Sequence, residues 1–361
     1  MFFSFAIVLL LTVLVSIISV PFVIRLAKKL NIVDKPDARK VHSRVMPRLG
    51  GLAIYIAFLA GYLYMSTIIE LPISIIVGAT IIMLVGFIDD KFQIKPWQKL
   101  LGQLLAAIVV LSDGLFIKYL TIPFVDESVQ VSLWIAIPIS LVWIIGVTNA
   151  VNLIDGLDGL ASGVSIIAAS AIFMMSLIMN DVIVAFLSIA LIGSTLGFLF
   201  FNFHPAKIFM GDTGSLLLGF LLSILSLISF KQVTIITLII PILILAVPII
   251  DTTIAIIRRK LNRQRIMDAD KNHLHHRLLA VGFSHRQAVL FIYSMAFFFG
   301  ASAILVYKAD LVASILIFVF LLLVTELLIE AFGLINKNYR PLLNLYFKLF
   351  PNRVNKHNKN A

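Results

Sequence analysis

Five aspartates lie at the ends of apolar segments, where an isolated carboxylate is unfavourable. They are Asp89, Asp90, Asp155, Asp158 and Asp212. A carboxylate at membrane depth costs on the order of 3 kcal/mol, so such residues are expected to have a functional partner. Hard divalent cations prefer carboxylate and phosphate oxygens. We therefore expect these residues to meet a magnesium ion with phosphates attached.

Asp89 and Asp90 close an apolar run in the segment Gly86–Lys91. Adjacent residues on a helix point about 100° apart, so one of the two carboxylates would face a given ligand fully. That carboxylate would act on substrate or metal, and the other would support it. A capped, solvated helix end explains the pair equally well.

A polar residue recurs at every third position between 149 and 158. The row consists of Asn149, Asn152, Asp155 and Asp158. Residues three apart are neighbours on a helix, while Gly156 and Gly159 predict that the segment breaks and lets the backbone approach a ligand closely. The regular interleaving with apolar residues argues against an ordinary solvated loop.

The segment Asn202–Ser215 contains Gly-Asp-Thr-Gly immediately before an apolar run. Asp212 or Thr213 could simply cap a helix there. The same helix start offers free N–H groups and a carboxylate oxygen to an anion or a hard metal ion. Phe209 belongs either to the core or to a platform that stacks on a flat ring.

Histidines cluster in the most basic loop. On a helix His273, His276 and Arg277 would share one face, with His275 nearly opposite. The spacing matches no common zinc motif, and the chain has no cysteine to complete one. We expect these side chains to bind a diphosphate or a sugar hydroxyl, although a basic cytoplasmic loop that happens to contain histidines is the plain alternative.

Two further basic segments receive less weight. They are the segment 40–51, which includes Arg48, and Lys99. Either could contact phosphate, but basic residues beside spans commonly serve only to set topology.

The elements that must position these residues are transmembrane helices. The 361 residues are 61% hydrophobic and 13% charged, and the mean hydropathy is +1.07. Such a composition excludes an ordinary soluble protein. Apolar runs of roughly 20 residues, the length of a helical span, recur throughout. We therefore predict an all-α, polytopic membrane helical bundle of about 11 spans. They are placed near 3–26, 49–68, 72–88, 98–116, 131–148, 160–179, 182–201, 214–230, 233–257, 287–306 and 311–332.

The basic residues orient this bundle. Of the 29 Lys and Arg residues, 26 fall in one set of connections, and only Lys118, Lys231 and Lys308 fall in the other. Because cytoplasmic loops are enriched in Lys and Arg, we expect the N-terminus outside and the C-terminus in the cytoplasm. All five aspartates and all seven histidines then lie on the cytoplasmic side, as a single site there requires.

Domain organisation and partners follow from the same pattern. Residues 1–332 are expected to form one transmembrane domain, and 333–361 a basic cytoplasmic tail. The net charge of +11 is concentrated on one face of the molecule, and the sequence contains no recognisable nucleic-acid-binding module. We therefore expect membrane lipids and anionic substrates as partners, and no nucleic acid. The oligomeric state, including a homodimer, is left open.

Taken together and in this order, the four motifs resemble the polyprenyl-phosphate N-acetylhexosamine-1-phosphate transferases. The resemblance extends from about Pro47 to Val289. The peptidoglycan-precursor branch of that family carries three consecutive histidines where this chain has His-Leu-His-His-Arg at 273–277. The sequence is most similar to the bacterial UDP-GlcNAc branch that begins wall teichoic acid synthesis. The absence of three consecutive histidines at 273–277 argues against a muramoyl-pentapeptide substrate.

The resemblance implies a reaction at the bacterial plasma membrane. UDP-GlcNAc and undecaprenyl phosphate would give GlcNAc-diphospho-undecaprenol and UMP, with Mg²⁺ as cofactor and Mn²⁺ as a substitute. Another surface polysaccharide, such as O-antigen, common antigen or capsule, is the alternative destination, and phospho-MurNAc-pentapeptide transfer the less favoured reaction.

The resemblance also implies a role for each residue. Asp212 would bind the metal with support from Asn202, and Asp89 would orient or deprotonate the lipid phosphate beside Asp90. The nucleotide would meet Asn152, Asp155, Asp158 and Phe209, the diphosphate and sugar would meet His273, His275, His276 and Arg277, and Lys99 would contact phosphate.

Two other classes of protein were weighed against this one. A cation-coupled transporter would also contain intramembrane carboxylates, but near the midplane and between repeated halves, and no repeat is visible. A scaffolding membrane protein would explain the hydropathy and leave the motifs unexplained.

Overall fold

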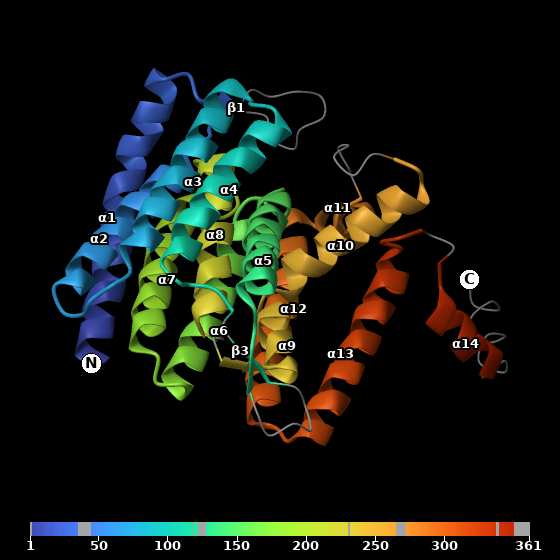
Figure 1. Ribbon diagram of the computed structural model, residues 1–361. Coiled ribbons are helices and arrows are strands. Elements are labelled where there is room, and N and C mark those ends of the chain that lie inside the picture. Colours follow the sequence, from blue (N-terminus) through green and yellow to red (C-terminus); the bar gives the residue numbers. More distant parts are fainter. Residues whose placement is uncertain are drawn as a thin grey trace.

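The computed structural model describes residues 2–34, 45–117, 119–121, 128–229, 232–264, 272–336 and 339–349. These ranges are mostly helical (Figure 1). The helices are α1 (Phe2–Lys29), α2 (Gly50–Ser66), α3 (Ile73–Phe92), α4 (Pro96–Ser112), α5 (Leu133–Leu153), α6 (Leu160–Ile178), α7 (Val182–Asn202), α8 (Gly211–Ser229), α9 (Ile235–Ile244), α10 (Ala246–Leu261), α11 (Leu274–Ala280), α12 (His285–Lys308), α13 (Leu311–Phe332) and α14 (Pro341–Leu349). The short strands are β1 (Val33–Asp34), β2 (Met46–Pro47), β3 (Tyr119–Thr121), β4 (Ser128–Gln130) and β5 (Gln232–Thr234).

The predicted fold class, an all-α polytopic membrane bundle, is confirmed. Within the described ranges, eight helices are long and apolar enough to cross a membrane, and α2 and α4 are shorter apolar helices. Each predicted span coincides with one helix, with one exception described below. The number of spans that cross the membrane and the direction of the termini stay predictions.

The span predicted at 233–257 is wrong in being continuous. The chain breaks at Leu245 into α9 and α10, and α10 then runs outward from the other helices (Figure 1). Pro241 and Pro248 flank the break. Proline has no backbone N–H and its ring clashes with the preceding turn, which kinks or ends a helix.

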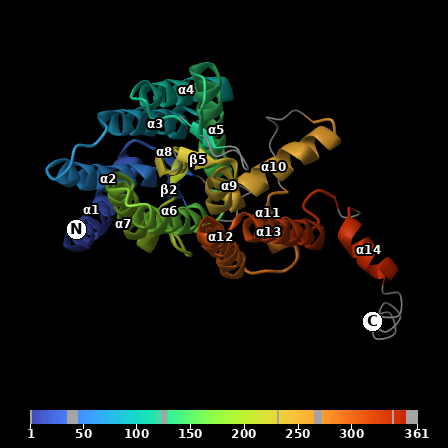
Figure 2. The same cartoon turned by 60° about the horizontal axis from the view of Figure 1, so that its bottom comes forward.

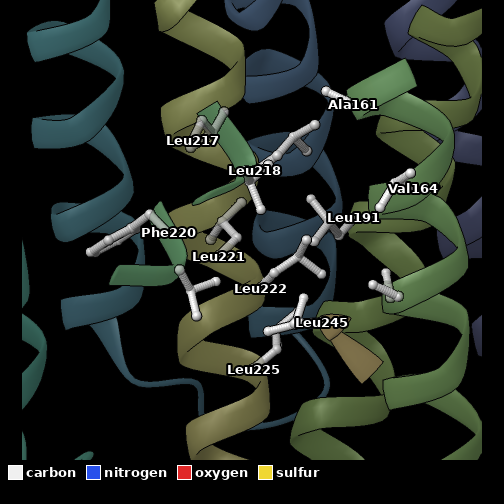
Figure 3. Close-up of a cluster of buried hydrophobic side chains, with 14 of the residues drawn as sticks. Ala161, Val164, Leu191, Leu217, Leu218, Phe220, Leu221, Leu222, Leu225 and Leu245 are labelled. Atoms are coloured by element: carbon white, nitrogen blue, oxygen red, sulfur yellow. The ribbon is translucent and has the colours of Figure 1, made fainter. Parts of the chain in front are cut away.

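Helix α8 is the centre of the bundle. All of its residues are buried, and it packs against α2, α3, α5 and α6. Figure 3 shows its leucines reaching Leu191 on α7 and Ala161 and Val164 on α6. A helix that is apolar all round must be enclosed by other helices, so α8 provides a fixed axis on which a site can be built.

The outer helices expose apolar side chains. On α1, Leu10, Leu14 and Ile18 recur every four residues and are exposed, while Thr12 and Ser16 on the other face are buried. A soluble protein rarely exposes such a continuous apolar stripe. In a bilayer the stripe faces lipid, and small or polar residues pack between helices.

The strands mark the two ends of the bundle. Strands β1 and β2 pair antiparallel, with Val33 opposite Pro47, and backbone hydrogen bonds join the chain after β2 to the residues just before α8. Figure 1 shows β1 at that end of the bundle. At the other end of α8, β3 pairs antiparallel with β4 and parallel with β5. Helices α2, α3, α5, α6 and α7 surround α8, while α10, α13 and α14 lie to one side (Figure 2). The start of α8 is therefore the end where the candidate residues can meet.

Candidate active site

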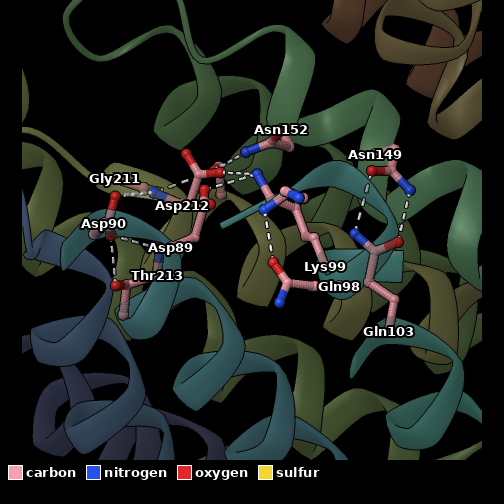
Figure 4. Close-up of polar contacts among 12 residues, drawn as sticks. Asp89, Asp90, Gln98, Lys99, Gln103, Asn149, Asn152, Gly211, Asp212 and Thr213 are labelled. Carbon is pink, nitrogen blue, oxygen red and sulfur yellow. Dashed lines mark hydrogen bonds and ion pairs between the residues drawn. The ribbon is translucent and has the colours of Figure 1, made fainter. Parts of the chain in front are cut away.

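Asp90 caps the N-terminus of α8. Its Oδ1 accepts a hydrogen bond from the backbone N–H of Asp212 at 2.9 Å, and its Oδ2 accepts from the backbone N–H and the hydroxyl of Thr213 at 2.9 and 2.6 Å (Figure 4). A carboxylate suits the free N–H groups and the positive end of a helix dipole. Asp90 thus fastens the end of α3 to the start of α8.

Two glycines make this contact possible. Gly211 has a φ of +70°, and a Cβ there would lie 2.5 Å from Oδ2 of Asp90. Gly86, one turn before Asp90, lies so close to α8 that a Cβ would be 2.5 Å from the Cα of Thr213. Only glycine permits both the left-handed backbone and the close approach. The glycines bring the end of α3 directly against the start of α8.

Three carboxylates and two cations form what we call the carboxylate cluster: Asp89, Asp90, Asp212, Arg48 and Lys99. Arg48 Nη2 lies 2.7 Å from Asp212 Oδ1, and its Nε lies 3.0 Å from Asp90 Oδ1. Lys99 Nζ lies 2.8 Å from Asp89 Oδ2 and also pairs with Asp212 Oδ2. Both oxygens of Asp212 therefore face a cation. Figure 4 shows Lys99 reaching towards Asp89 and Asp212.

Backbone pairing on two sides holds Arg48 in place. Its backbone N–H donates to the carbonyl of Ile32 at 3.1 Å. On the other side, Phe209 donates its N–H to the carbonyl of Pro47 at 2.9 Å and accepts from the N–H of Gly50 at 3.0 Å. Burial disfavours the charged guanidinium, but the carboxylates of Asp90 and Asp212 outweigh this effect and raise the pKa of Arg48. The cation is therefore permanent.

The loop after α5 brings Asn152 and Asp155 to the same end. Asn152 Nδ2 donates to Ser215 Oγ on α8 at 2.7 Å. Burial raises the pKa of Asp155 to about 7; the charge of Arg48 opposes this shift, and those of Asp212 and Asp90 add to it. Asp155 is therefore electrostatically part of the carboxylate cluster. Asn149, the first residue of the polar row, instead bonds with Gln103 at 2.8 Å and joins α5 to α4.

The loop after α7 is bonded to the turn before α6. Asn202 Oδ1 accepts from Gly159 N–H at 3.1 Å and from the Ser162 hydroxyl at 2.8 Å, and its amide donates to the carbonyl of Ile208 at 3.0 Å. Asp158 Oδ2 accepts from the N–H of Ala206 at 3.1 Å. Asn202 is therefore buried among protein partners and supports the loop that leads to Asp212.

The segment 273–277, called the histidine loop below, is anchored by Asp251. Its carboxylate lies 2.8 Å from His273 Nδ1 and accepts from the Leu274 N–H at 2.8 Å. The His275 ring packs against Gly156, where a Cβ would lie 2.2 Å from Nε2. Burial lowers the pKa of His275 to about 3, so this imidazole is neutral. The histidine loop therefore contacts the loop that carries Asp155.

The remaining predicted residues have different surroundings. His276 lies beside His275, with ring centroids 4.2 Å apart. Arg277 donates to the carbonyl of Gly333 at the end of α13. Phe209 is half-buried, and its backbone carries the pairing with Pro47 and Gly50 described above. None of these positions by itself tests the predicted contacts with substrate.

Sequence reasoning underrated Arg48 and missed Asp251. Arg48 stood among basic residues that could equally have set topology. Asp251 is the only charged residue in the predicted span 233–257, and a single intramembrane carboxylate was a signal that could have found it.

The carboxylate cluster suits a hard divalent cation. Its carboxylate oxygens are the ligands such ions prefer. The side chains of Asp89 and Asp212 keep 12% and 11% of their surface exposed, while Asp90 is enclosed. Asp212 and Asp89 are thus the residues of the cluster that could bind an ion, and Arg48 and Lys99 show that the site already attracts positive charge.

The sequence is similar to those of known proteins. Residues 72–230 match the family described as glycosyl transferase family 4. The chain is 49% identical over 345 residues, 95% of each chain, to a probable undecaprenyl-phosphate N-acetylglucosaminyl 1-phosphate transferase of Bacillus subtilis. It is 37% identical over 308 residues, 74% of this chain and 75% of the relative, to a decaprenyl-phosphate N-acetylglucosaminephosphotransferase of Mycobacterium leprae.

A third relative represents another substrate. The chain is 33% identical over 313 residues, 81% of this chain and 93% of the relative, to a phospho-N-acetylmuramoyl-pentapeptide-transferase of Halalkalibacterium halodurans. Among these three relatives, the two named for N-acetylglucosamine are 49% and 37% identical to the chain, and the one named for the muramoyl pentapeptide is 33% identical.

Proposed function

The chain belongs to glycosyl transferase family 4 and is a multi-pass bacterial membrane enzyme. On this premise we propose that it transfers N-acetylglucosamine 1-phosphate from UDP-GlcNAc to undecaprenyl phosphate. The products are GlcNAc-diphospho-undecaprenol and UMP. One observation carries the proposal: two cations and three carboxylates meet at the N-terminus of the buried helix α8. Such an arrangement suits phosphoryl transfer, which depends on positioning and charge neutralisation.

The reaction moves one phosphoryl group. An oxygen of the lipid phosphate attacks the phosphorus that carries the sugar, and the bond from that phosphorus to the oxygen of the UMP phosphate breaks. Negative charge grows on the leaving oxygen and on the transferred group. Arg48 and Lys99 are the cations of the carboxylate cluster that can face this charge.

We assign the metal to Asp212, with Asp89 beside it. A bound Mg²⁺, or Mn²⁺ in its place, supplies a hard positive charge that polarises phosphate oxygens. The support is the donor set: both side chains are partly exposed, and each already pairs with a cation. Asp212 and Asp89 would hold the ion, and Arg48 and Lys99, which now pair with Asp212, would then be free to bind phosphate oxygens.

The second role of Asp89 is to orient the lipid phosphate. We favour direct attack by that phosphate over a covalent Asp89 intermediate, because the lipid phosphate is already an oxyanion. Asp89 pairs with Lys99 at 2.8 Å, so a substrate phosphate approaching Lys99 also meets Asp89. Asp90 acts as a positioning residue, since both of its oxygens accept hydrogen bonds from the start of α8.

We assign the nucleotide to the loop after α5, through Asn152 and Asp155. Asn152 is held by Ser215, and Asp155 lies within the field of the carboxylate cluster. Phe209 as a stacking surface and Asp158 as a nucleotide contact remain predictions.

The sugar and diphosphate are assigned to the histidine loop. The neutral ring of His275 lies on Gly156 of the nucleotide loop, and His276 stands beside it. A neutral imidazole can donate to or accept from a sugar hydroxyl. Asp251 holds this loop through His273. Arg277 as a diphosphate contact stays a prediction, since its described partner is Gly333.

The test is release of UMP by purified protein. UDP-GlcNAc, UDP-GalNAc and UDP-MurNAc-pentapeptide are each offered with and without undecaprenyl phosphate, and with Mg²⁺ or EDTA. We expect UMP only when UDP-GlcNAc, the lipid phosphate and Mg²⁺ are all present. Absence of UMP with every sugar nucleotide would overturn the proposal, and turnover of the muramoyl pentapeptide alone would change the substrate.

The destination of the product is a separate prediction. The motif resemblance points to wall teichoic acid, and the amount of that polymer in cells depleted of the protein is the measurement. Unchanged teichoic acid with loss of another surface polysaccharide would redirect the assignment.

A further inference from the structure

A second cluster of ligating side chains lies beside the candidate active site. Asp158 comes from the turn before α6, His204 from the loop after α7, and His285 is the first residue of α12. One potential ligand atom from each lies within 4.8 Å of the others. We call these three residues the Asp-His-His cluster.

The Asp158 and His204 side chains are already paired. His204 Nδ1 lies 2.8 Å from Asp158 Oδ2. A hydrogen bond between two loops would account for these two residues, and it needs no metal ion. This plain explanation leaves out the third residue.

His285 is the member that the hydrogen bond does not explain. Its ring stacks on that of His204, with centroids 4.2 Å apart and planes 21° apart, and the backbone of Asp158 lies beside it. Both ring nitrogens are buried, yet neither makes a hydrogen bond of normal geometry within the described residues. Buried polar atoms without partners are rare and commonly mark an unseen water or ion.

From this geometry we propose that Asp158, His204 and His285 bind a borderline divalent transition-metal ion, for which Zn²⁺ is the probe. Two imidazole nitrogens and one carboxylate oxygen are the ligands that zinc and cobalt accept, whereas Mg²⁺ prefers oxygen alone. Three protein ligands leave a fourth position for water or another small ligand. The proposal goes beyond the transferase activity and stands without it, and it gives Asp158 the role of a metal ligand in place of the predicted nucleotide contact.

The distances are compatible with such a site. With metal–ligand bonds near 2.1 Å, tetrahedral ligand atoms lie roughly 3.4 Å apart. The three ligand atoms lie within 4.8 Å of one another, so no pair has to close by more than about 1.4 Å, while His204 Nδ1 and Asp158 Oδ2, now 2.8 Å apart, have to separate by about 0.6 Å. The His204 side chain is 37% exposed and that of Asp158 17%, which leaves an ion a path from solvent.

Surrounding contacts hold two of the ligands in position. The N–H of Ala206 donates to Asp158 Oδ2 at 3.1 Å, and Arg286 Nη2 donates to the carbonyl of His204 at 3.2 Å. Such outer contacts orient metal ligands and are part of a metal site. Because the ligands come from three elements, a bound ion would also join the loops after α5 and α7 to α12.

The experiment measures metal binding without substrate. Tag-free protein is stripped with EDTA in detergent, returned to Mg²⁺-containing buffer, and titrated with Co²⁺ and Zn²⁺. We expect one high-affinity ion per chain, a visible Co²⁺ absorption typical of four-coordination, and a rise in the thermal unfolding temperature with Zn²⁺.

Matched variants locate the ion. His204→Gln and His285→Gln should each weaken Zn²⁺ binding by at least tenfold and abolish the thermal shift. Lys207→Gln is the control, because it changes an exposed residue of the loop that carries His204 and keeps all three ligands and their outer contacts. Wild-type protein that binds no Zn²⁺, or binding unchanged in both glutamine variants, would overturn the proposal.

The histidine loop is the competing location for zinc. Zinc binding that persists in His285→Gln and is lost in His276→Gln would assign the ion to that loop and also overturn the proposal. Because no readout here is turnover, failure of this proposal leaves the proposed transferase reaction untouched, and the reverse holds as well.

Discussion

Replacement of Arg48 by lysine tests whether the reaction needs one guanidinium group bound to two carboxylates at once. Arg48 reaches Asp212 through Nη2 at 2.7 Å and Asp90 through Nε at 3.0 Å, so one planar group ties both carboxylates. Lysine keeps the positive charge but offers a compact ammonium on a flexible stem. We expect Arg48→Lys to keep one of these contacts and lose the other.

The magnitude follows from that single loss. A hydrogen bond to a charged group contributes about 1.5–3 kcal/mol. The Arg48 side chain is 36% exposed, so solvent screening places the loss near the lower end of that range. At 1.36 kcal/mol per decade, about 1.5 kcal/mol is roughly a tenfold fall in kcat/KM. Arg48→Met loses both contacts and the charge, and should fall by at least a further tenfold.

The assay is UMP release under saturating lipid phosphate, with Mg²⁺ varied. Removal of the Arg48 charge also removes a cation that competes for Asp212. Arg48→Met should therefore need less Mg²⁺ for half-maximal rate even though its maximal rate is lower. Arg25→Lys is the control, since Arg25 is exposed at the end of α1 and should retain full activity.

Two results would refute this reasoning. Wild-type kcat/KM in Arg48→Lys would show that the reaction does not need one guanidinium group bound to two carboxylates. An unchanged or increased Mg²⁺ requirement in Arg48→Met would show that the arginine does not compete with the metal at Asp212.

Three further predictions concern other parts of the site. Asp212→Asn should lower turnover by at least about 10³-fold, a loss typical of a group that stabilises transition-state charge, with an unchanged gel-filtration profile; substantial activity would remove the metal assignment. The pKa of Asp155 is raised to about 7, so the folded state binds this proton more tightly than the unfolded state. Without Mg²⁺, thermal stability should therefore fall as the pH rises from about 4 to about 7 and level off above; Asp155→Asn should flatten that profile, and an unchanged profile would contradict the shift. Asp251→Asn weakens the anchor of His273 and the Leu274 N–H, and should cost about 1–3 kcal/mol of stability, measured by thermal unfolding, together with activity; a fully stable and active variant would show that the histidine loop does not need this anchor.

The helices were predictable because hydropathy is a local property. Each predicted span coincides with a helix apart from the one at 233–257, where the apolar pattern continues through Leu245 and hides the break. Pro241 and Pro248 were visible in the sequence, but prolines are tolerated inside transmembrane helices when neighbours satisfy the freed backbone groups. α1, for example, contains Pro21 and continues through it.

The candidate site was predictable as a set of residues and not as an arrangement. Asp89, Asp90 and Asp212 were selected because carboxylates at span ends are costly. The different roles of Asp89 and Asp90 could not be predicted from the sequence, because adjacent residues on one helix differ only in the direction of their side chains. Asp90 points at the start of α8 and caps it, whereas Asp89 faces Lys99. That difference depends on where α8 and α4 pack.

The amino-acid sequence alone determined the membrane class, the helical elements and the chemical types at the candidate site, because hydropathy, helix length and carboxylate cost depend on nearest neighbours in the chain. The tertiary structure decided the partners: Arg48 with Asp212, Asp251 with His273, and His285 with Asp158 and His204. These residues are separated by tens to more than a hundred positions. Only the packing of helices around α8 brings them within bonding distance.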